Sequence, residues 1–546
     1  MMRLFDEHTL RQVTTLDGLW TLTAEDMAYP FLVPGVWERI PALTTWRGVA
    51  EIERTVVIDK PGHVLLRFGG VSHTATVWWD GEKVGWHYNA FTAFEVLLKD
   101  VQAGVHTLRV TVDNRFTKES LLHVPNDYYT YGGINRPVEL HALGAARICR
   151  MAFSCTETGE GAYLAKVNVQ VQALEDCAAM QLHVAAAGGE AMAEVPTLKE
   201  DETACVTVQF PVSGVQKWDI RQGRLYDLSA KLLADGRIMD DLIDRVGFRT
   251  VEVRGEDMLL NGRKVFVKGF NRHEDHGQFG CALSVDAMMD DIHLILDSGA
   301  NSIRTCHYPN DPRFLDLCDA MGLLVWEENH ARAIDIHPEG FDEVCAIVNE
   351  EMVTQHVNHP CIYTWGILNE CESETEFGRE VYRKQLEQLR RLDPTRPVTF
   401  ASCWFFTDIC LDLVDIASFN IYPLWYHSEP AADYATRLAA WMDENGAKDK
   451  PIIFSEFGAG AIAGFHDPFG RAKWSEERQG DILDAQLTAI LGMERVSGAY
   501  IWQFADVKVA EEWAYSRPKT QNNKGIVDMY RRPKMSYAVV KKHFKG

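Results

Sequence analysis

Trp365–Glu370, WGILNE, is a short apolar run that ends on a glutamate, and Ile453–Gly458, IFSEFG, carries a second glutamate in the same setting. Both runs belong to a series of eight short apolar segments that alternate with amphipathic stretches between Val265 and Phe504. If each segment is a strand of one parallel barrel, both carboxylates emerge at the same face, where such barrels carry their active sites. The pattern therefore predicts a (β/α)₈ barrel with two acidic side chains at its mouth.

The alternation of strand-like and helix-like periods after about residue 251 supports this barrel. The predicted strands are Lys264–Gly269, Asn301–Thr305, Leu323–Trp326, Ile362–Ile367, Val398–Ala401, Ile416–Asn420, Ile452–Ser455 and Ala499–Phe504. Helical periodicity covers Val285–Ser298, Arg313–Met321, Phe341–His356, Glu376–Leu392 and Ile482–Val496. A doubly wound open sheet is the competing topology, and it is disfavoured because no Gly-x-Gly-x-x-Gly turn follows the first strand.

The residues before the barrel are rich in short β-like runs that Gly, Pro, Asn and Asp interrupt. Asp80-Gly81 after the run Thr76–Trp79 is a strong hairpin signal. We therefore predict a multidomain β and α/β protein. Its parts are an antiparallel β-sandwich over 1–145, an immunoglobulin-like β-sandwich over 146–250 and the (β/α)₈ TIM barrel over 251–546.

Composition and charge exclude several classes of partner. The formal net charge of −23 would repel nucleic acid and anionic membranes, so an anionic substrate would need a local cationic anchor. No apolar stretch approaches the ~18 residues of a membrane span, and the N-terminus lacks the pattern of a secretory signal. The 12 cysteines include no Cys-x-x-Cys pair, which is typical of reduced thiols. We expect a soluble, cytoplasmic protein.

Two carboxylates at one barrel mouth fit the hydrolysis of a glycosidic bond. That reaction needs one protonated carboxyl group to release the leaving oxygen and one ionised group to attack or to activate water. Two such close groups cannot both ionise easily, so one pKa should rise and that group becomes the acid. Asn369 offers an amide to a sugar hydroxyl, and Trp502 offers an apolar floor for a sugar ring. The alternatives are that Glu370 and Glu456 cap helices or pair with arginines, and that Trp502 only packs in the core.

Three further motifs carry a resemblance to a known family. They are NDYYTYGGINRP (Asn126–Pro137), GFNRHED (Gly269–Asp275) and SIRTCHYP (Ser302–Pro309). With these motifs the chain resembles the family-two glycoside hydrolases from about residue 15 to 545, and among them most closely the β-glucuronidases. The resemblance implies that the sandwich over 1–145 is a sugar-binding-like jelly roll and that the barrel over 251–546 is catalytic. The resemblance implies that Glu370 is the acid/base and Glu456 the nucleophile of a retaining mechanism, with carboxyl groups about 5 to 5.5 Å apart. It implies no cofactor, and the absence of a His-Glu-x-x-His motif predicts no metal site.

The resemblance also points to an acidic sugar. Asn522 and Lys524 are similar to the Asn-x-Lys motif with which β-glucuronidases hold the C6 carboxylate, and an ammonium and an amide there would give charge-assisted hydrogen bonds. Asn420, Tyr422 and Tyr426 belong to a second matching motif, in which Tyr422 would bind the nucleophile and Tyr426 the carboxylate of the sugar. Taken alone, the first motif is a solvated turn and the second a packed aromatic rim.

The remaining assignments depend on the resemblance. Asp275 and His307 map onto sugar-contacting positions, although an isolated histidine after a strand is more often structural. Glu328 and His330 depart from the usual pattern, and Arg517 and Lys519, which could supply a second carboxylate contact, cannot be aligned. The short stretch between Trp326 and Trp365 predicts an open mouth that admits bulkier or oligosaccharide substrates.

Together these patterns predict a retaining exo-glycosidase that removes terminal β-D-glucuronic acid from a small conjugate or a glycan. A β-galactosidase or β-galacturonidase on the same scaffold is the alternative within the enzyme class. A non-catalytic carbohydrate-binding protein is the alternative outside it. By resemblance, the chain is expected to form a homo-oligomer, for which a tetramer is common.

Overall fold

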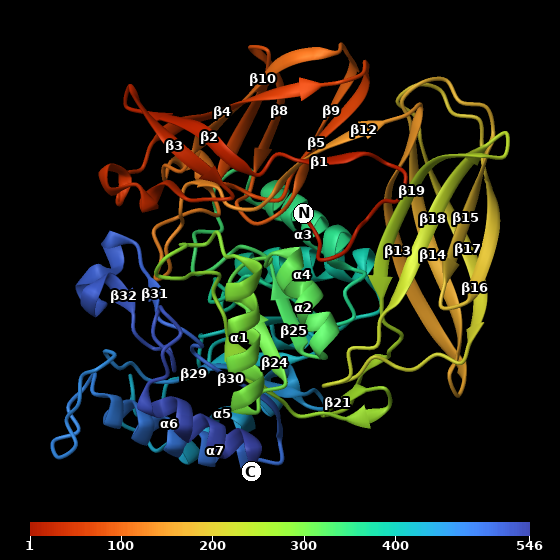
Figure 1. Cartoon of the computed structure of the whole chain (residues 1–546). Coiled ribbons are helices and arrows are strands. Elements are labelled where there is room, and N and C mark those ends of the chain that lie inside the picture. Colours follow the sequence, from red (N-terminus) through yellow and green to blue (C-terminus); the bar gives the residue numbers. More distant parts are fainter.

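Two β-sandwiches precede a closed parallel barrel in the computed structural model, which describes residues 1–546 (Figure 1). The first sandwich pairs a six-stranded sheet, β3-β2-β4-β10-β7-β8, with a four-stranded sheet, β1-β12-β5-β9. Its strands are β1 (Val13–Thr15), β2 (Gly18–Ala24), β3 (Met27–Val33), β4 (Val49–Ile58), β5 (Gly62–Phe68), β6 (Val71–Ser72), β7 (Thr74–Trp79), β8 (Glu82–Tyr88), β9 (Phe94–Val101), β10 (Gly104–Asp113), β11 (Gly133–Ile134) and β12 (Val138–Leu143). The predicted hairpin at Asp80-Gly81 is confirmed, with positive φ at both residues, as a tight turn between β7 and β8 requires.

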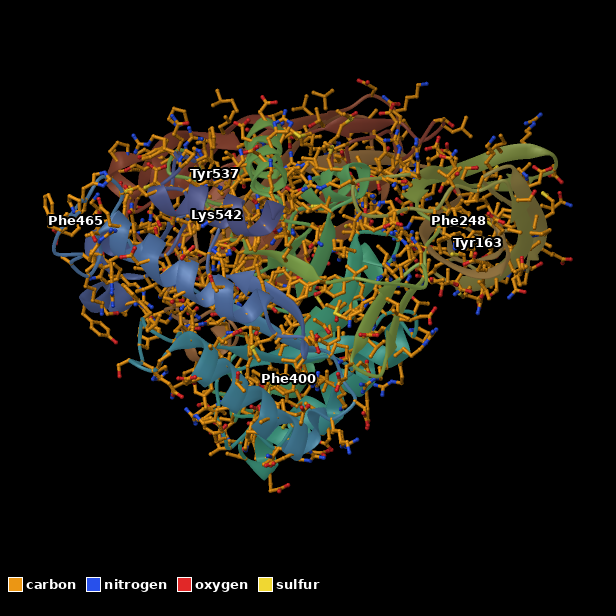
Figure 2. All side chains as sticks on the ribbon, turned by 90° about the horizontal axis from the view of Figure 1, so that it is seen from below. Tyr163, Phe248, Phe400, Phe465, Tyr537 and Lys542 are labelled. Atoms are coloured by element: carbon orange, nitrogen blue, oxygen red, sulfur yellow. The ribbon has the colours of Figure 1, made fainter.

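The second sandwich has a three-stranded sheet, β13-β14-β17, and a four-stranded sheet, β16-β15-β18-β19. Its strands are β13 (Ala146–Gly159), β14 (Ala162–Ala173), β15 (Met180–Ala186), β16 (Gly189–Val195), β17 (Thr203–Ser213), β18 (Tyr226–Ala234) and β19 (Arg237–Val246). Inward-facing apolar residues alternate with exposed polar ones along β14, which fits a strand with one buried face. Tyr163 and Phe248 pack together in this core (Figure 2).

Eight parallel strands, β23 to β30, close into the predicted barrel, because β23 pairs with both β24 and β30. The strands are β23 (Val267–Asn271), β24 (Ser302–Thr305), β25 (Leu324–Glu328), β26 (Ile362–Ile367), β27 (Val398–Ser402), β28 (Ala417–Asn420), β29 (Ile452–Phe457) and β30 (Val496–Ile501). The helices are α1 (Val285–Ser298), α2 (Pro312–Met321), α3 (Phe341–His356), α4 (Glu376–Leu392), α5 (Ala431–Met442), α6 (Glu476–Leu491) and α7 (Met535–Lys545). The fold class expected from the sequence is thus confirmed.

The first and last barrel strands differ from the prediction. Lys264 belongs to a separate three-stranded sheet, β20 (Val251–Arg254), β21 (Asp257–Leu260) and β22 (Arg263–Lys264), because it pairs with Leu259 rather than with a barrel strand. The last strand begins at Val496, which the sequence pattern had placed in a helix, and ends before Trp502. The helix α6 ends earlier, at Leu491, and the sequence analysis did not use Gly492, the residue after it, as a helix end. The periodicity also did not reveal α5 and α7.

Separate hydrophobic cores fill the three parts of the chain. One lies within the first sandwich, one within the second, and the largest surrounds the barrel strands and their helices. These cores support the division at about residues 145 and 250, which stays a prediction. No helix has both the length and the apolar character that a membrane span requires.

The first sandwich also contacts the mouth of the barrel. Asn126 Nδ2 donates to the carbonyl oxygen of Arg332 at 3.2 Å, and Tyr128 OH lies 3.1 Å from His330 Nε2. The segment 125–131 between β10 and β11 therefore lies against the loop that follows β25, at the barrel end that holds both glutamates.

Substitution of Phe270 tests the packing between the barrel and its last helix. Its side chain is fully buried, and its ring lies 5.9 Å from that of Phe504 and 5.8 Å from that of Phe544 on α7. Phe270→Ala should lower the free energy of unfolding of the barrel by about 3 to 5 kcal/mol, measured by urea denaturation. Phe469→Ala is the matched control, because that ring is 97% exposed. Equal urea midpoints for the two variants would contradict this packing.

Candidate active site

The structure brings Glu370 and Glu456 into one pocket at the C-terminal end of the barrel. Glu370 lies three residues after the end of β26, and Glu456 lies within β29. Asn420, at the end of β28, donates from Nδ2 to Glu370 Oε1 at 2.9 Å. Tyr422, in the next loop, donates its hydroxyl to Glu456 Oε2 at 2.7 Å. Two neighbouring residues of one chain segment thus contact both carboxylates, so the carboxylates face a common space.

The backbone around Glu370 is held in an uncommon conformation. Leu368 and Glu370 both have positive φ, 45° and 54°, which costs a non-glycine residue of order 1 kcal/mol. Hydrogen bonds hold this conformation: Glu370 N donates to the carbonyl of Ala401 at 2.9 Å and Leu368 N to Asn329 Oδ1 at 3.2 Å. This strained turn directs the Glu370 side chain into the pocket.

Arg304 is the central cation of the pocket and is fully buried in β24. Its Nη1 donates to Glu456 Oε1 at 2.9 Å, and its Nε and Nη2 each donate to Glu328 at 2.9 Å. Nη2 also donates to Asn369 Oδ1 at 2.7 Å. One rigid guanidinium group thus fixes two carboxylates and the amide beside Glu370.

The pKa of Glu456 is raised to about 8. Burial is the main cause, the charge of Glu370 adds to it, and Arg304 and the Tyr422 hydroxyl oppose it. The sequence argument expected the rise on the acid, Glu370. The structure puts it on Glu456 because that side chain is 4% exposed, whereas that of Glu370 is 16% exposed. Near neutral pH, below this raised pKa, Glu456 therefore retains its proton in the free enzyme.

Lys524 lies in the same pocket and is only 3% exposed. Its ammonium lies 5.4 Å from the ring centre of Tyr422 and 5.3 Å from that of Tyr426, and it forms no ion pair with any acidic residue. Although burial raises the pKa of Tyr426, the Lys524 ammonium brings that pKa below its ordinary value. A buried cation without a carboxylate partner is costly, which makes it a candidate anion-binding group.

Asp127 enters the pocket from the first sandwich. It lies 3.5 Å from Arg332 and 3.0 Å from Arg517, and it accepts a 3.2 Å hydrogen bond from Asn522 Nδ2. Burial alone would raise the pKa of Asp127, but the two arginines outweigh it and hold that pKa well below its usual range. Arg332 also reaches Glu370 Oε2, at 3.2 Å. The charged wall of the pocket is therefore built from two parts of the chain.

Several buried polar atoms around the glutamates have no hydrogen-bond partner within the protein. They are Asp127 Oδ1, His307 Nε2, Arg332 Nε, Asn369 Nδ2 and Asn522 Oδ1. Buried polar groups normally find a partner, so such a cluster of donors and acceptors fits a polar ligand or ordered water. A molecule that carries several hydroxyl groups matches this mixture of donors and acceptors.

His307 and Trp502 lie side by side in this pocket. Their rings stack at 5.0 Å with 21° between the planes, and His307 Nε2 is 4.0 Å from Glu456 Oε1. Burial holds the pKa of His307 well below its ordinary value, so the imidazole is neutral. Both residues are placed where they could contact a sugar, and their binding roles stay predictions.

Asp275 is placed differently from the other predicted residues. Tyr131 OH donates to its Oδ1 and Lys508 N to its Oδ2, both at 2.8 Å. Both oxygens are thus engaged in the contact between the first sandwich and the barrel, and a sugar contact there stays a prediction. Lys519 is exposed, and Arg517 forms its ion pair with Asp127.

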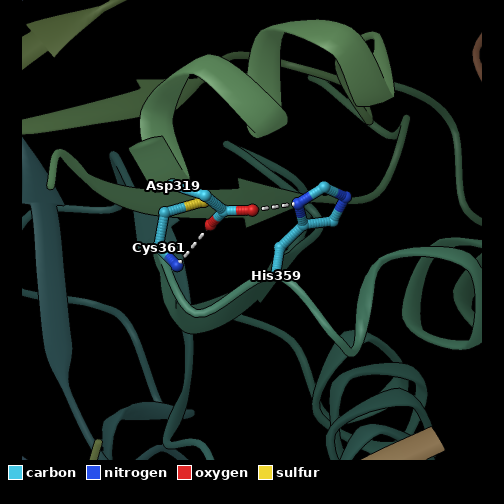
Figure 3. A group of neighbouring side chains, drawn as sticks. All are labelled: Asp319, His359 and Cys361. Atoms are coloured by element: carbon cyan, nitrogen blue, oxygen red, sulfur yellow. Dashed lines mark hydrogen bonds and ion pairs between the residues drawn. The ribbon is translucent and has the colours of Figure 1, made fainter. Parts of the chain in front are cut away.

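Asp319, His359 and Cys361 form a fully buried group of potential metal ligands at the opposite end of the barrel (Figure 3). Asp319 Oδ2 lies 2.5 Å from His359 Nδ1, and Asp319 Oδ1 accepts from Cys361 N at 2.9 Å. Burial raises the pKa of Asp319 to about 7 and raises that of Cys361 well above its ordinary value. The two hydrogen bonds already engage the Asp319 carboxylate and His359 Nδ1. The raised pKa keeps the Cys361 thiol protonated, and a thiol is a poor metal ligand unless it ionises.

Residues 251–546 match the family model described as "Glycosyl hydrolases family 2, TIM barrel domain". The chain therefore belongs to glycoside hydrolase family 2, and it is a glycoside hydrolase.

Named relatives cover nearly the whole chain. A β-glucuronidase of Streptococcus agalactiae is 27% identical over 89% of this chain and 86% of its own length, and that of Sus scrofa is 29% identical over 89% and 78%. Among solved structures, a family-two β-galacturonidase from Eisenbergiella tayi, bound to galacturonate, is 46% identical, with a TM-score of 0.97 over 100% of this chain and 99% of that one. A β-D-glucuronidase from Dictyoglomus thermophilum is 25% identical, with a TM-score of 0.87 over 99% and 98%.

Sequence reasoning assigned no role to Arg304, Arg332 or Asp127. Arg304 carried a signal, since a charged residue inside a predicted barrel strand, Asn301–Thr305, requires a buried partner of opposite charge. Asp127 lies within the motif Asn126–Pro137, which indicated the family but gave no role to this aspartate. Arg332 lies in a loop without any periodic pattern, so no local signal could have placed it beside Glu370.

The coupling of the two glutamates predicts how pH affects the Glu370→Gln variant. Wild-type activity should fall as pH rises through about 8, because the pair then loses the proton that the leaving group needs. Glu370→Gln removes the neighbouring negative charge, so the pKa of Glu456 should fall. With an aryl glycoside whose leaving group needs no protonation, the rate of this variant should rise with pH at a midpoint clearly below 8. If the pH midpoint of the variant equals or exceeds the midpoint of the alkaline decline in wild-type activity, the coupling of the two glutamates is contradicted.

Proposed function

We propose that this enzyme is a retaining exo-β-hexuronidase, which removes a terminal uronic acid from a β-glycoside. The observation that carries the proposal is the buried Lys524 ammonium, which has no ion-pair partner and lies beside Tyr422, the residue that binds Glu456. A uronate carboxylate would give this ammonium its counter-charge. The same sugar would satisfy the unpartnered atoms of Asn522 and Asn369.

In the proposed reaction, Glu456 attacks the anomeric carbon while Glu370 protonates the aglycone oxygen. Glu370 then removes a proton from the water that releases the sugar from Glu456. The hydrogen bonds from Arg304 and Tyr422 stabilise the ionised Glu456, and Asn420 orients Glu370. The free Nδ2 of Asn369 is available to a sugar hydroxyl next to the reacting carbon. Substrate that places its leaving oxygen at Glu370 would draw the proton of Glu456 to that carboxylate.

We propose β-galacturonides as the preferred substrates, with β-glucuronides second. The 46% identity to the Eisenbergiella tayi β-galacturonidase over the whole chain supports the first. The β-glucuronidases that are 26–29% identical to this chain support β-glucuronides as the alternative substrates. The sequence analysis also predicted β-glucuronides. The two sugars differ only in the orientation of the C4 hydroxyl, and that contact sets the preference. Self-association and a cytoplasmic location stay predictions.

Four chromogenic β-glycosides that differ only at C4 and C6 test the proposal. They are the galacturonide, glucuronide, galactoside and glucoside of one aryl alcohol. The expected order of kcat/KM is galacturonide, glucuronide and then both neutral glycosides. A glucuronide that exceeds the galacturonide would reverse the C4 assignment, and a neutral glycoside that exceeds both uronides would overturn the uronate assignment.

Lys524→Met should abolish the advantage of the acidic sugars. A hydrogen bond to a charged group contributes about 1.5 to 3 kcal/mol, so kcat/KM for the uronides should fall roughly 10- to 100-fold. The rate with the neutral galactoside should not fall. Lys519→Met is the matched control, since it removes an exposed ammonium from the same loop and should leave all rates unchanged. If uronide cleavage by Lys524→Met equals that of the control, the carboxylate does not bind Lys524.

A further inference from the structure

A buried ion pair lies directly behind the loop that carries Lys524. Lys534, the residue before α7, is 3% exposed, and Asp506, after β30, is 2% exposed. Lys534 Nζ lies 2.8 Å from Asp506 Oδ1. Neither residue touches Glu370 or Glu456, and the proposed reaction gives neither a role. An ion pair that is removed from water in this way is costly to bury unless further hydrogen bonds satisfy it.

Those further hydrogen bonds all go to the backbone of the active-site loops. Lys534 Nζ donates to the carbonyl of Asn523 at 3.2 Å and to the carbonyl of Ala461 at 2.7 Å. Asp506 Oδ1 accepts from the backbone N–H of Gly525 at 2.9 Å. The ion pair thus holds both sides of Lys524, through residues 523 and 525. Through Ala461 it also holds the segment that follows the strand of Glu456.

The loop packs tightly at Gly525. A Cβ atom at Gly525 would lie 2.2 Å from Asp506 N and 2.4 Å from Val527 O, so the two backbones are in direct contact. The carbonyl of Gly525 accepts a 3.0 Å hydrogen bond from Gln479 Nε2 of α6, and Gln479 Oε1 accepts from Ser536 of α7. Figure 1 shows α6 and α7 packed side by side beneath this end of the chain.

We propose that Lys534 and Asp506 are positioning residues that set the substrate specificity of the enzyme, by fixing the distance between the Lys524 ammonium and Glu456. The proposal rests on the proposed function, because it takes Lys524 as the group that binds the uronate. The sugar has its carboxylate at one end and its anomeric carbon at the other. Lys524 and Glu456 must therefore lie at a fixed separation to reach both groups at once. Lys534 joins the loop of Lys524 to the segment that follows the strand of Glu456, so the selectivity of the pocket depends on a pair that never contacts the sugar.

The charge balance of the pair explains why single substitutions should disturb the loop. Burial raises the pKa of Asp506 to about 6, while Lys534 opposes that rise. Lys534→Met removes three hydrogen bonds and leaves the Asp506 carboxylate without its cation, so the loop between residues 522 and 525 loses its anchor. Asp506→Asn is milder, because an amide oxygen of nearly the same shape can still accept from Gly525 N.

The test compares kcat and KM for the aryl galacturonide and the aryl galactoside in full-length variants. For Lys534→Met, KM for the galacturonide should rise at least tenfold while kcat/KM for the galactoside changes less than twofold. Asp506→Asn should lower the ratio of kcat/KM for the galacturonide to kcat/KM for the galactoside as Lys534→Met does, but by a smaller factor. Lys542→Met, an exposed lysine on α7 (Figure 2), is the matched control and should leave the ratio unchanged.

The outcomes separate this proposal from the function on which it rests. If Lys524→Met destroys uronide selectivity but both Lys534→Met and Asp506→Asn keep it, the positioning role is wrong and the proposed function stands. Equal losses for the acidic and the neutral sugar in both variants would mean a merely structural role, which also overturns the positioning role. If Lys524→Met leaves selectivity intact, the proposed function and this inference fail together. Should Lys534→Met not fold, the nearly isosteric Asp506→Asn decides.

Discussion

The pocket is organised around a cation that the protein itself leaves unpaired. The chain has a formal net charge of −23, yet it buries the Lys524 ammonium beside two tyrosine rings without a carboxylate in contact. Such an arrangement costs stability in the free enzyme, and a bound anion would offset that cost. In an acidic protein, this local charge is what would let an anionic sugar approach a pair of glutamates. Under the proposed function, the identity of the substrate would depend on a group that performs no chemistry.

A second constraint is the raised pKa of Glu456. Glu456 is buried more deeply than Glu370, and its pKa is raised to about 8 despite its contacts with Arg304 and Tyr422. In the proposed double displacement, Glu456 must give up its proton before it can attack the anomeric carbon. Arg304 contacts Glu456, Glu328 and Asn369 at once, so one side chain sets both the electrostatics and the geometry of the reacting groups.

The sequence predicted the barrel well because its strands are continuous apolar runs of the right length, with helical periods between them. It failed at the ends, where Lys264 pairs within a small separate sheet and Val496 begins a strand that looked helical. The sequence singled out the glutamates because they end apolar runs, and Lys524 because of its motif; the roles of all three stay predictions. Asp127 and Arg332 were not found as functional groups, since their proximity arises from the docking of the first sandwich on the barrel mouth. Contacts between distant segments leave no periodic signal in either segment.

The most direct measurement is a crystal structure of the Glu370→Gln variant with an intact aryl β-galacturonide. The account predicts that the C6 carboxylate lies within hydrogen-bond distance of Lys524 Nζ and Asn522, and that the anomeric carbon faces a carboxylate oxygen of Glu456. A sugar bound with its carboxylate directed away from Lys524, or with its anomeric carbon turned from Glu456, would contradict the account.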